Sequence, residues 1–176
     1  DSRVLWLPDV FGYSGALPQI MKKCGIDYFM TTKLSWNQFN KFPCNTFYWY
    51  GIDGTRVLAH FPPTGDYNAY PDPARLRQQV NAFKEKDRCE ESLLSYGWGD
   101  GGGGPDSRHL EFLRRAANLE GLPRCRQKTV TQFFHGIDGT PDLPSWVGEL
   151  YLELHRGTYT TQGHNKRNNR KAELLY

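Results

Sequence analysis

Two aspartates, Asp9 and Asp100, each follow a run of strand-forming residues, in "RVLWLPD" and "LLSYGWGD". If the two strands are neighbours in a parallel sheet, their carboxyl ends meet at one edge and both carboxylates face a shared pocket. Such a pair provides the general acid/base and nucleophilic groups that cleavage of a glycosidic bond requires. An isolated aspartate after a strand also serves as a helix N-cap or a turn former, so either residue alone fits both interpretations.

The glycines that follow Asp100 suggest a second chemistry. In "GDGGGGP", the run Gly101 to Gly104 would let backbone amides approach an anion, as phosphate-binding loops do. The Lys-Ser/Thr pair of a P-loop does not follow these glycines, and their spacing is not that of a dinucleotide-binding fingerprint. We favour the interpretation that the glycines let the backbone come close to a bulky ligand, or let Asp100 project into a cavity.

A third polar cluster lies in "ELYLELHRGTYTTQ". Strand alternation would place Glu149, Tyr151, Glu153 and His155 on one face, which is unusually polar for a core strand. The alternative is a barrel-edge strand whose salt-bridged side faces solvent, and both interpretations stay open. Tryptophans suit sugar rings, although most are expected in the core, and all five fall near expected strand ends: Trp6, Trp36, Trp49, Trp98 and Trp146.

The elements that must position these residues alternate along the chain, because Gly and Pro divide it into short apolar runs and longer amphipathic ones. Strands are predicted at "RVLWLP", "DYFMTTK", "LLSYG" and "WVGELYLEL", and helices at 15–25, 72–86, 105–121 and near the C-terminal end. A hairpin is predicted around Asp53-Gly54, while "KTVTQFF" fits either a short helix or a strand. The predicted fold class is α/β, with a parallel sheet or a β/α barrel.

Composition excludes several classes of protein. The formal charge of +3 arises from 22 basic and 19 acidic residues spread along the chain, which is too mild a balance to predict a nucleic-acid partner. No apolar run is long enough to span a bilayer. The four cysteines form no close pair, so free thiols in a reducing compartment are favoured over disulfides, and zinc ribbons and redox motifs are not expected. Because Asp1 falls directly before a strand, we expect a fragment.

Long stretches of the chain closely resemble the catalytic domain of class II α-mannosidases, glycoside hydrolase family 38. They are "LWLPDVFGYSGALPQIMKKCGIDYFMTTKLSWNQFNKFP", "NTFYWYGIDGTRVLAHFPP", "GWGDGGGGP" and "GELYLELHRGTYTTQ". The resemblance covers essentially the whole chain, in order, and is strongest to the cytosolic and vacuolar branch. One departure is Cys44 in "FPCN", a loop position where His or another polar residue is expected.

The resemblance implies a retaining, zinc-dependent hydrolase of terminal α-mannosides. Asp9 then corresponds to the nucleophile, which also touches the zinc ion, and the other zinc ligands are expected outside this chain. Asp100 is the candidate general acid/base, although relatives of the Golgi and lysosomal branch have two adjacent carboxylates where this chain has Asp100-Gly101. Lys33 falls where relatives place a basic residue near the substrate, and Tyr67 is a weaker candidate. Residues Glu153 and His155 complete the substrate-binding candidates.

The same resemblance implies an incomplete seven-stranded β/α barrel over residues 1–158 and, over 159–176, the start of a helix that leads into a helical bundle. The expected partners are a mannose-containing oligosaccharide, the remainder of the same polypeptide and further copies in a homo-oligomer, with no nucleic acid and no membrane. A cytoplasmic or vacuolar location is expected. Two alternatives stay open: a non-catalytic carbohydrate-binding or scaffold role, and an enzyme of a phosphate ligand that uses the glycine-rich loop.

Overall fold

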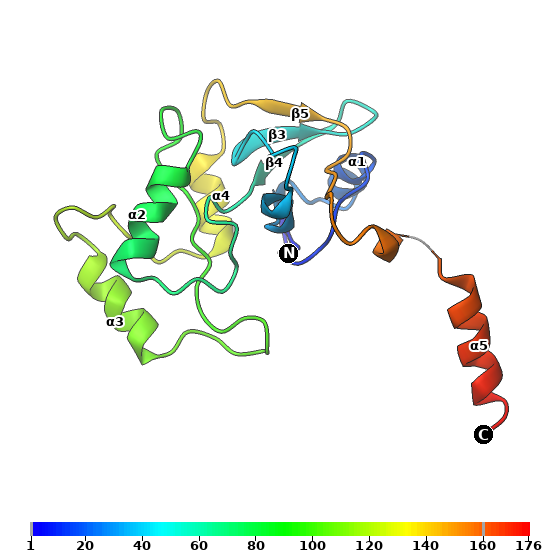
Figure 1. The fold of residues 1–176 in the computed structure, drawn as a ribbon. Coiled ribbons are helices and arrows are strands. Elements are labelled where there is room, and N and C mark those ends of the chain that lie inside the picture. Colours follow the sequence, from blue (N-terminus) through cyan, green and yellow to red (C-terminus); the bar gives the residue numbers. More distant parts are fainter. Residues whose placement is uncertain (1, 160) are drawn as a thin grey trace.

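The computed structural model describes residues 2–159 and 161–176, which form a five-stranded sheet and its surrounding helices (Figure 1). The strands are β1 (Val4–Trp6), β2 (Tyr28–Met30), β3 (Thr46–Tyr50), β4 (Arg56–His60) and β5 (Ser145–Val147). The helices are α1 (Leu17–Lys23), α2 (Pro73–Ala82), α3 (Ser107–Ala116), α4 (Val130–Ile137) and α5 (Gly163–Glu173), with 3₁₀ turns η1 (Lys33–Trp36) and η2 (Arg156–Tyr159).

The sheet is mixed rather than wholly parallel. Its strand order is β1-β2-β4-β3-β5; β1, β2 and β4 run parallel, whereas β3 pairs antiparallel with β4 and parallel with β5. The expected α/β class is therefore confirmed in a coarser form. The parallel part brings the ends of β1 and β2 to the same edge, which is where Asp9 and Lys33 follow these strands.

The hairpin predicted around Asp53-Gly54 is present between β3 and β4. Tyr50 pairs with Arg56 at its end, and the turn closes through a hydrogen bond from Gly51 N to Thr55 O of 2.8 Å. Gly54 has φ +80°, a left-handed conformation that glycine adopts without steric cost, and this explains the strength of the sequence signal.

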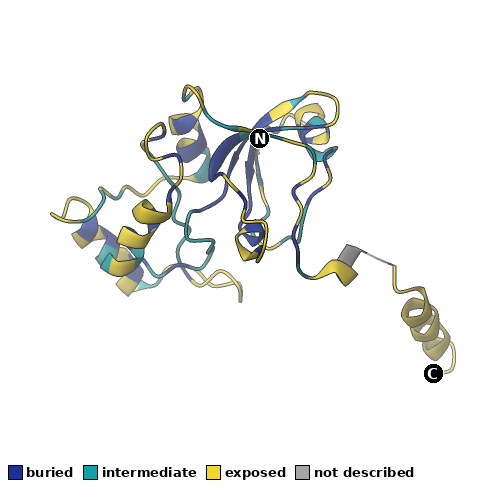
Figure 2. Ribbon diagram, turned by 45° about the horizontal axis from the view of Figure 1, so that its top comes forward, coloured by how far each residue is buried: buried dark blue, intermediate teal, exposed yellow. Residues whose placement is uncertain are grey.

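Both faces of the sheet are buried, which explains the continuous apolar runs of its strands. On β2, Phe29 belongs to one hydrophobic cluster with Phe47 and Trp49, while Met30 belongs to a second cluster with Phe134. Figure 2 shows the buried residues gathered along the strands and the helix surfaces that face them. Helix α1 packs on the first cluster through Met21, and α4 packs on the second. The site therefore rests on a rigid sheet edge.

The ambiguous "KTVTQFF" is a helix. Thr129 is the N-cap of α4, with its hydroxyl accepting from Gln132 N, and the Gln132 side chain accepts in turn from Thr129 N. This capping box is the signal that favours the helix over a strand. The four cysteines are free, as predicted, and Cys44 lies in a loop but is buried in the first cluster.

One predicted strand is wrong, and another is confirmed only in its first residues. The segment "LLSYG" is not a strand and, among the residues that the structure describes, makes one isolated bridge, between Tyr96 and Ala69. The segment "WVGELYLEL" is a strand only up to Val147, because Gly148 adopts φ +98° and turns the chain; one further bridge joins Leu150 to Tyr13. Apolar runs bounded by glycine fit buried loops as well as strands.

The C-terminal helix α5 contributes no buried residue and stands apart from the rest of the chain (Figure 1). Within the part of the chain that the structure describes, no helix combines the length and apolar character needed to cross a membrane.

Candidate active site

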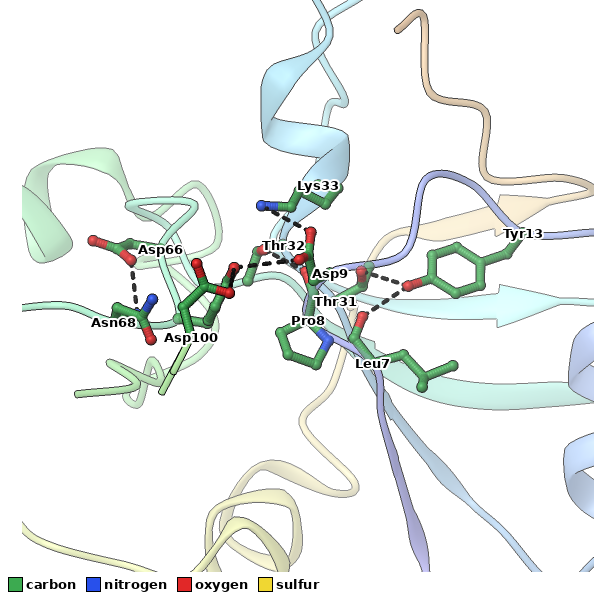
Figure 3. Close-up of polar contacts among 11 residues, drawn as sticks. Leu7, Pro8, Asp9, Tyr13, Thr31, Thr32, Lys33, Asp66, Asn68 and Asp100 are labelled. Carbon is green, nitrogen blue, oxygen red and sulfur yellow. Dashed lines mark hydrogen bonds and ion pairs between the residues drawn. The ribbon is translucent and has the colours of Figure 1, made fainter. Parts of the chain in front are cut away.

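The turn that carries Asp9 is held against the residues that follow β2. Beyond the strand, Leu7 N donates to Met30 O at 3.0 Å, and the Thr32 hydroxyl donates to Pro8 O at 2.6 Å. Figure 3 shows this turn with Asp9 leaving it toward Asp100. The backbone that leads into Asp9 is therefore fixed by two hydrogen bonds to the segment at the end of β2.

Tyr13 supports the same turn from inside the core. Its buried ring packs on Phe29, and its hydroxyl contacts Leu7 O at 2.8 Å and the Thr31 hydroxyl at 2.7 Å (Figure 3). The tyrosine thus links the residues after β1 to those after β2, which keeps Asp9 in register with the 3₁₀ turn η1.

Lys33 places a positive charge directly beside Asp9. Its Nζ lies 3.1 Å from Asp9 Oδ1, 4.0 Å from the centre of the Trp36 ring and 4.8 Å from the centre of the Tyr67 ring. Aromatic faces attract cations, so the two rings and the carboxylate together hold the ammonium group. Lysine is thus fixed at the site although it extends from a short 3₁₀ turn.

Tyr67 connects the two candidate carboxylates. The residue lies in the loop after β4, and its hydroxyl oxygen is 3.4 Å from Asp9 Oδ2 and 3.3 Å from Asp100 Oδ1. A hydroxyl has one proton, so it donates to one carboxylate at a time. Burial and the negative charges of Asp9 and Asp100 raise the pKa of Tyr67 to about 12, which keeps this proton in place at neutral pH.

The shared hydroxyl limits the separation of the two carboxylates. Because each carboxylate lies within hydrogen-bond reach of the same oxygen, the nearest oxygens of the two carboxylates are at most about 7 Å apart. This limit allows the separation of roughly 5 Å found in retaining glycosidases. It excludes most of the range, up to about 9.5 Å, found in inverting ones. The upper limit is therefore compatible with the carboxylate spacing of a retaining glycosidase.

The glycine-rich loop projects Asp100 toward Asp9. Gly97 has φ +107°, and a Cβ on it would lie 2.8 Å from Pro105 N; a Cβ on Gly103 would lie 2.5 Å from Trp98 O. Glycine at these two positions therefore lets the loop fold back on itself, and the Trp98 N–H closes it by donating to Gly104 O at 3.1 Å. Asp100, which this loop carries, lines the cavity, as one of the two interpretations of the glycines predicts.

A cavity of about 360 Å³ lies between the two carboxylates. Its walls come from three segments distant in sequence: the end of β1, the loop after β4 and the glycine-rich loop. The lining residues include Trp6, Asp9, Tyr67, Tyr96, Asp100 and Gly103. Four of the six site residues predicted from sequence, namely Asp9, Lys33, Tyr67 and Asp100, meet at or beside this cavity.

Glu153 is used elsewhere. Its carboxylate accepts from the backbone amides of Gln38, Phe39 and Asn40 at 2.5 to 2.9 Å and from the Asn40 side chain at 2.8 Å. These donors, led by Phe39 N, lower the pKa of Glu153 to about 2. The predicted polar strand face is therefore wrong: Glu153 is buried and anchors the loop after η1.

His155 contacts the same Trp36 ring as Lys33. Its exposed ring packs against Phe11 with centroids 4.7 Å apart and against Trp36 at 5.9 Å, and its φ of +56° is unusual for a residue other than glycine. The residue therefore belongs to an aromatic rim near Asp9 rather than to the lining of the cavity.

The residues that the structure describes do not form a zinc site. Among them, no group of three His, Cys, Asp or Glu side chains is placed to hold a metal ion, whereas a catalytic zinc needs about three protein ligands. One oxygen of the Asp9 carboxylate forms an ion pair with Lys33, and the other faces the Tyr67 hydroxyl. Asp9 can therefore supply one ligand at most.

The charges beside the glycine loop disfavour the phosphate interpretation. The amides of Trp98, Gly99 and Gly102 donate within the loop or to Asn68, and Asp9 and Asp100 face the cavity beside them. Two carboxylates beside the loop give a phosphate an unfavourable electrostatic field.

Sequence comparison assigns the family. The profile described as "Glycosyl hydrolases family 38 N-terminal domain" matches residues 1–149. The chain belongs to glycosyl hydrolases family 38. It is similar to alpha-mannosidase 2C1 of Homo sapiens, with 48% identity over 97% of this chain, and to alpha-mannosidase G of Dictyostelium discoideum, with 49% identity over 96%. It spans 16% of the length of each of these relatives.

A solved structure confirms the fold of this family 38 chain. The crystal structure of an alpha-mannosidase from Enterococcus faecalis V583 superimposes with a TM-score of 0.62 at 17% identity, covering 85% of this chain and 18% of that one.

Two residues that sequence analysis missed, Thr32 and Asn68, support the site from positions next to Lys33 and Tyr67. Their only sequence signal is this adjacency.

Proposed function

We propose that this chain is part of a family 38 α-mannosidase that hydrolyses terminal α-D-mannosyl residues of oligosaccharides with retention of configuration. The observation that carries the proposal is the Tyr67 hydroxyl, which lies within 3.4 Å of both Asp9 and Asp100 and so limits their separation. The similarity to proteins named alpha-mannosidase supports the choice of mannose as the sugar.

Asp9 is the nucleophile in this proposal. One of its oxygens bonds to the anomeric carbon while the bond between that carbon and the glycosidic oxygen breaks, and Asp100 as a carboxylic acid gives its proton to the departing oxygen. In the second step the Asp100 carboxylate takes a proton from water, the water oxygen attacks the anomeric carbon, and Asp9 is released. The Tyr67 hydroxyl can donate its hydrogen bond to whichever of the two carboxyl groups is ionised at each step.

Lys33 and Asp9 meet the substrate from one side of the cavity. The ammonium group, fixed by the rings of Trp36 and Tyr67, keeps the Asp9 carboxylate oriented and offers a donor to a sugar hydroxyl. His155 is a candidate for binding the substrate farther along the aromatic rim. Zinc dependence is also part of the proposal, with Asp9 as one ligand and the others supplied by the rest of a longer polypeptide; the metal would orient sugar hydroxyls.

The architecture of the whole enzyme belongs to the same proposal. We expect residues 1–158 to form part of a seven-stranded β/α barrel and 159–176 to begin a helical bundle, in a homo-oligomer located in the cytoplasm or vacuole. The exposed α5 and the open outer edges of β1 and β5 support additional structure around this chain.

Covalent trapping tests the proposed mechanism. The longest native form of the polypeptide would be incubated with a fluorinated α-mannoside that stalls the glycosyl-enzyme, digested, and its peptides weighed for an added sugar. A label on Asp9 is the expected result. No label in a folded, zinc-supplied sample that nevertheless binds mannose would favour the non-catalytic carbohydrate-binding role.

The role of Asp100 needs a separate measurement. Asp100→Ala is expected to lower turnover of an oligosaccharide by about 100-fold or more, because a general acid contributes on the order of a hundred-fold to ten-thousand-fold. Azide, which needs no general base to attack the glycosyl-enzyme, should restore turnover of an activated aryl mannoside. Unchanged activity of Asp100→Ala would assign the acid/base role to another residue.

A further inference from the structure

The loop that carries Tyr67 is joined to the segment that carries Asp100 by a row of short contacts. Ala69 N donates to Ser95 O at 3.0 Å, and the Ser95 hydroxyl donates to Tyr67 O at 3.0 Å. Gly97 N then donates to Ala69 O at 3.4 Å, which completes an isolated parallel bridge between the two segments. Neither segment belongs to the sheet, so these contacts set the position of the Asp100 segment relative to the loop that carries Tyr67.

Asn68 contacts the residue next to Asp100. Its side-chain oxygen accepts from Gly99 N at 2.9 Å, and Gly99 directly precedes Asp100. Asn68 is itself fixed, because its backbone amide donates to Asp66 Oδ1 at 2.8 Å (Figure 3). Adjacent residues thus reach opposite sides of the cavity: the Tyr67 side chain contacts both carboxylates, and the Asn68 side chain holds the backbone beside one of them.

The Asn68 side chain leaves no room for a side chain at position 99. A Cβ at Gly99 would lie 2.6 Å from Asn68 Oδ1, closer than atoms approach, whereas no other atom comes within 3.5 Å of it. The backbone of Gly99 is not in the left-handed region, so an alanine is conformationally acceptable there. Glycine is therefore required at this position by the side chain of Asn68 and not by the turn.

We propose that Asn68 is a positioning residue that sets the Asp100 carboxyl group at the correct distance from Asp9. This inference rests on the proposed function, in which Asp100 protonates the departing oxygen. A loop with four successive glycines has much conformational freedom, and the Asn68–Gly99 hydrogen bond restricts it at the residue before the acid. Trp98 restricts the loop further, because its indole N–H donates to Asp106 Oδ2, which follows the glycines, at 3.3 Å.

The effect of losing Asn68 should depend on the leaving group. A dinitrophenolate departs without protonation, whereas the alcohol of a disaccharide needs the acid. Asn68→Ala is therefore expected to lower kcat/KM for a mannobiose by about 100-fold, as a misplacement of roughly 1 Å does. For dinitrophenyl α-mannoside, kcat/KM should stay within about 3-fold of the wild-type value, because it reports the step in which this leaving group departs unaided. Asn81→Ala, on the exposed face of α2, is the matched control and should change neither value.

Gly99→Ala provides an independent route to the same defect. The added methyl group displaces the Asn68 amide, so the single variant should show the same selective loss on mannobiose. In the double variant with Asn68→Ala the clash is absent and the contact already lost, so kcat/KM should fall no further than in either single variant.

The outcomes separate this inference from the function on which it rests. An equal loss on both substrates, or losses that multiply in the double variant, would overturn the positioning role while leaving mannoside hydrolysis intact. A wild-type polypeptide that hydrolyses neither mannoside would instead overturn the proposed function. Each variant would be measured in the longest native form of the polypeptide, with its circular dichroism spectrum compared with that of the wild type.

Discussion

Lys33 Nζ lies 3.1 Å from Asp9 Oδ1, yet the lysine side chain is only 7% exposed while that of the aspartate is 47% exposed. The cation is therefore the fixed partner and the carboxylate is the one that faces the cavity. A buried ammonium group held by the rings of Trp36 and Tyr67 keeps its position, so its attraction fixes the direction of the more exposed carboxylate. Lys33 is thus placed to orient the proposed nucleophile.

Replacement of Lys33 by methionine should lower kcat/KM by about 10- to 100-fold, because hydrogen bonds to charged groups contribute roughly 1.5–3 kcal/mol. Methionine keeps the apolar stem between the rings of Trp36 and Tyr67 but removes the charge. Steady-state kinetics on a mannoside check the prediction. The control is Lys22→Met, which breaks an exposed ion pair with Asp27 and should leave kcat/KM unchanged. Equal kinetics for wild type and Lys33→Met would contradict the orienting role.

Tyr67→Phe removes the shared hydroxyl but keeps the ring beside Lys33. We expect kcat/KM to fall by about 10-fold, corresponding to one hydrogen bond of roughly 1.4 kcal/mol in the transition state. Because the pKa of Tyr67 is raised to about 12, the wild-type pH–rate profile should show no titration of this hydroxyl below about pH 10. The alkaline side of the profile should therefore be the same in both proteins, and an alkaline limb lost only in the variant would show that Tyr67 titrates in the working range.

Much of the site could be predicted from sequence because it depends on local rules. Asp9 follows β1, whose parallel pairing with β2 brings the strand ends together, and alternating short apolar and amphipathic runs predict such pairing. Lys33 and Tyr67, by contrast, are candidates only through the resemblance to family 38. The hairpin at Gly54 follows from turn chemistry alone. Where the function of a residue is set by the end of a strand or by a tight turn, the sequence contains the necessary information.

The remaining errors concern long-range contacts. The segment before Asp100 has the composition of a strand, but Ser95 is hydrogen-bonded to the Tyr67 loop, and no strand of the described residues extends this pairing. Glu153 has the spacing of a strand face, but its partners lie more than a hundred residues earlier, at 38–40. Periodicity describes a segment by itself, whereas these residues are determined by which distant backbone amides need an acceptor.

Glu153 offers a test between the role predicted from sequence and the one seen in the structure. Glu153→Gln removes the charge that accepts from three backbone amides, so it should lower the thermal midpoint while kcat and KM of the folded protein change little. Because the pKa of Glu153 is held near 2, the stabilisation by its carboxylate is present above about pH 4.5 and is lost as the pH falls toward 2. Thermal melts and steady-state kinetics on one sample check both parts. A large rise in KM without a change in melting would favour the substrate-binding role.

We expect the buried His60 to make the folded protein less stable in mild acid. The ring is completely buried at the end of β4, with Nδ1 2.9 Å from the Thr46 hydroxyl and Nε2 accepting from Leu93 N at 3.2 Å. Burial lowers the pKa of His60 to about 3 from about 6.5 in the unfolded chain. Between these values the unfolded state binds a proton that the folded state does not, so the free energy of unfolding decreases as the pH falls, by up to about 1.4 kcal/mol per pH unit.

Denaturant unfolding of the longest native polypeptide between about pH 7 and pH 5 measures this dependence. His60→Gln should be less stable near pH 7, where Thr46 and Leu93 lose part of their hydrogen bonding, but its stability should vary less with pH. His135→Gln changes an exposed histidine and should keep the wild-type slope. If His60→Gln and the wild type have the same slope, the acid dependence arises from other groups.

The isolated 176-residue chain should fold poorly without further structure around it. Within the sheet of the described residues, β1 and β5 have a partner on one side only, and unpaired strand edges are sites of association between chains. Large apolar side chains are also exposed, including Trp36 at 43%, Val147 at 74% and Leu175 at 87%. We therefore expect no single cooperative transition in calorimetry of the isolated chain, together with binding of a hydrophobic dye at low temperature. A sharp, reversible transition in a monomeric sample would show that these edges and side chains need no cover, because the buried clusters on the two faces of the sheet would then suffice for stability.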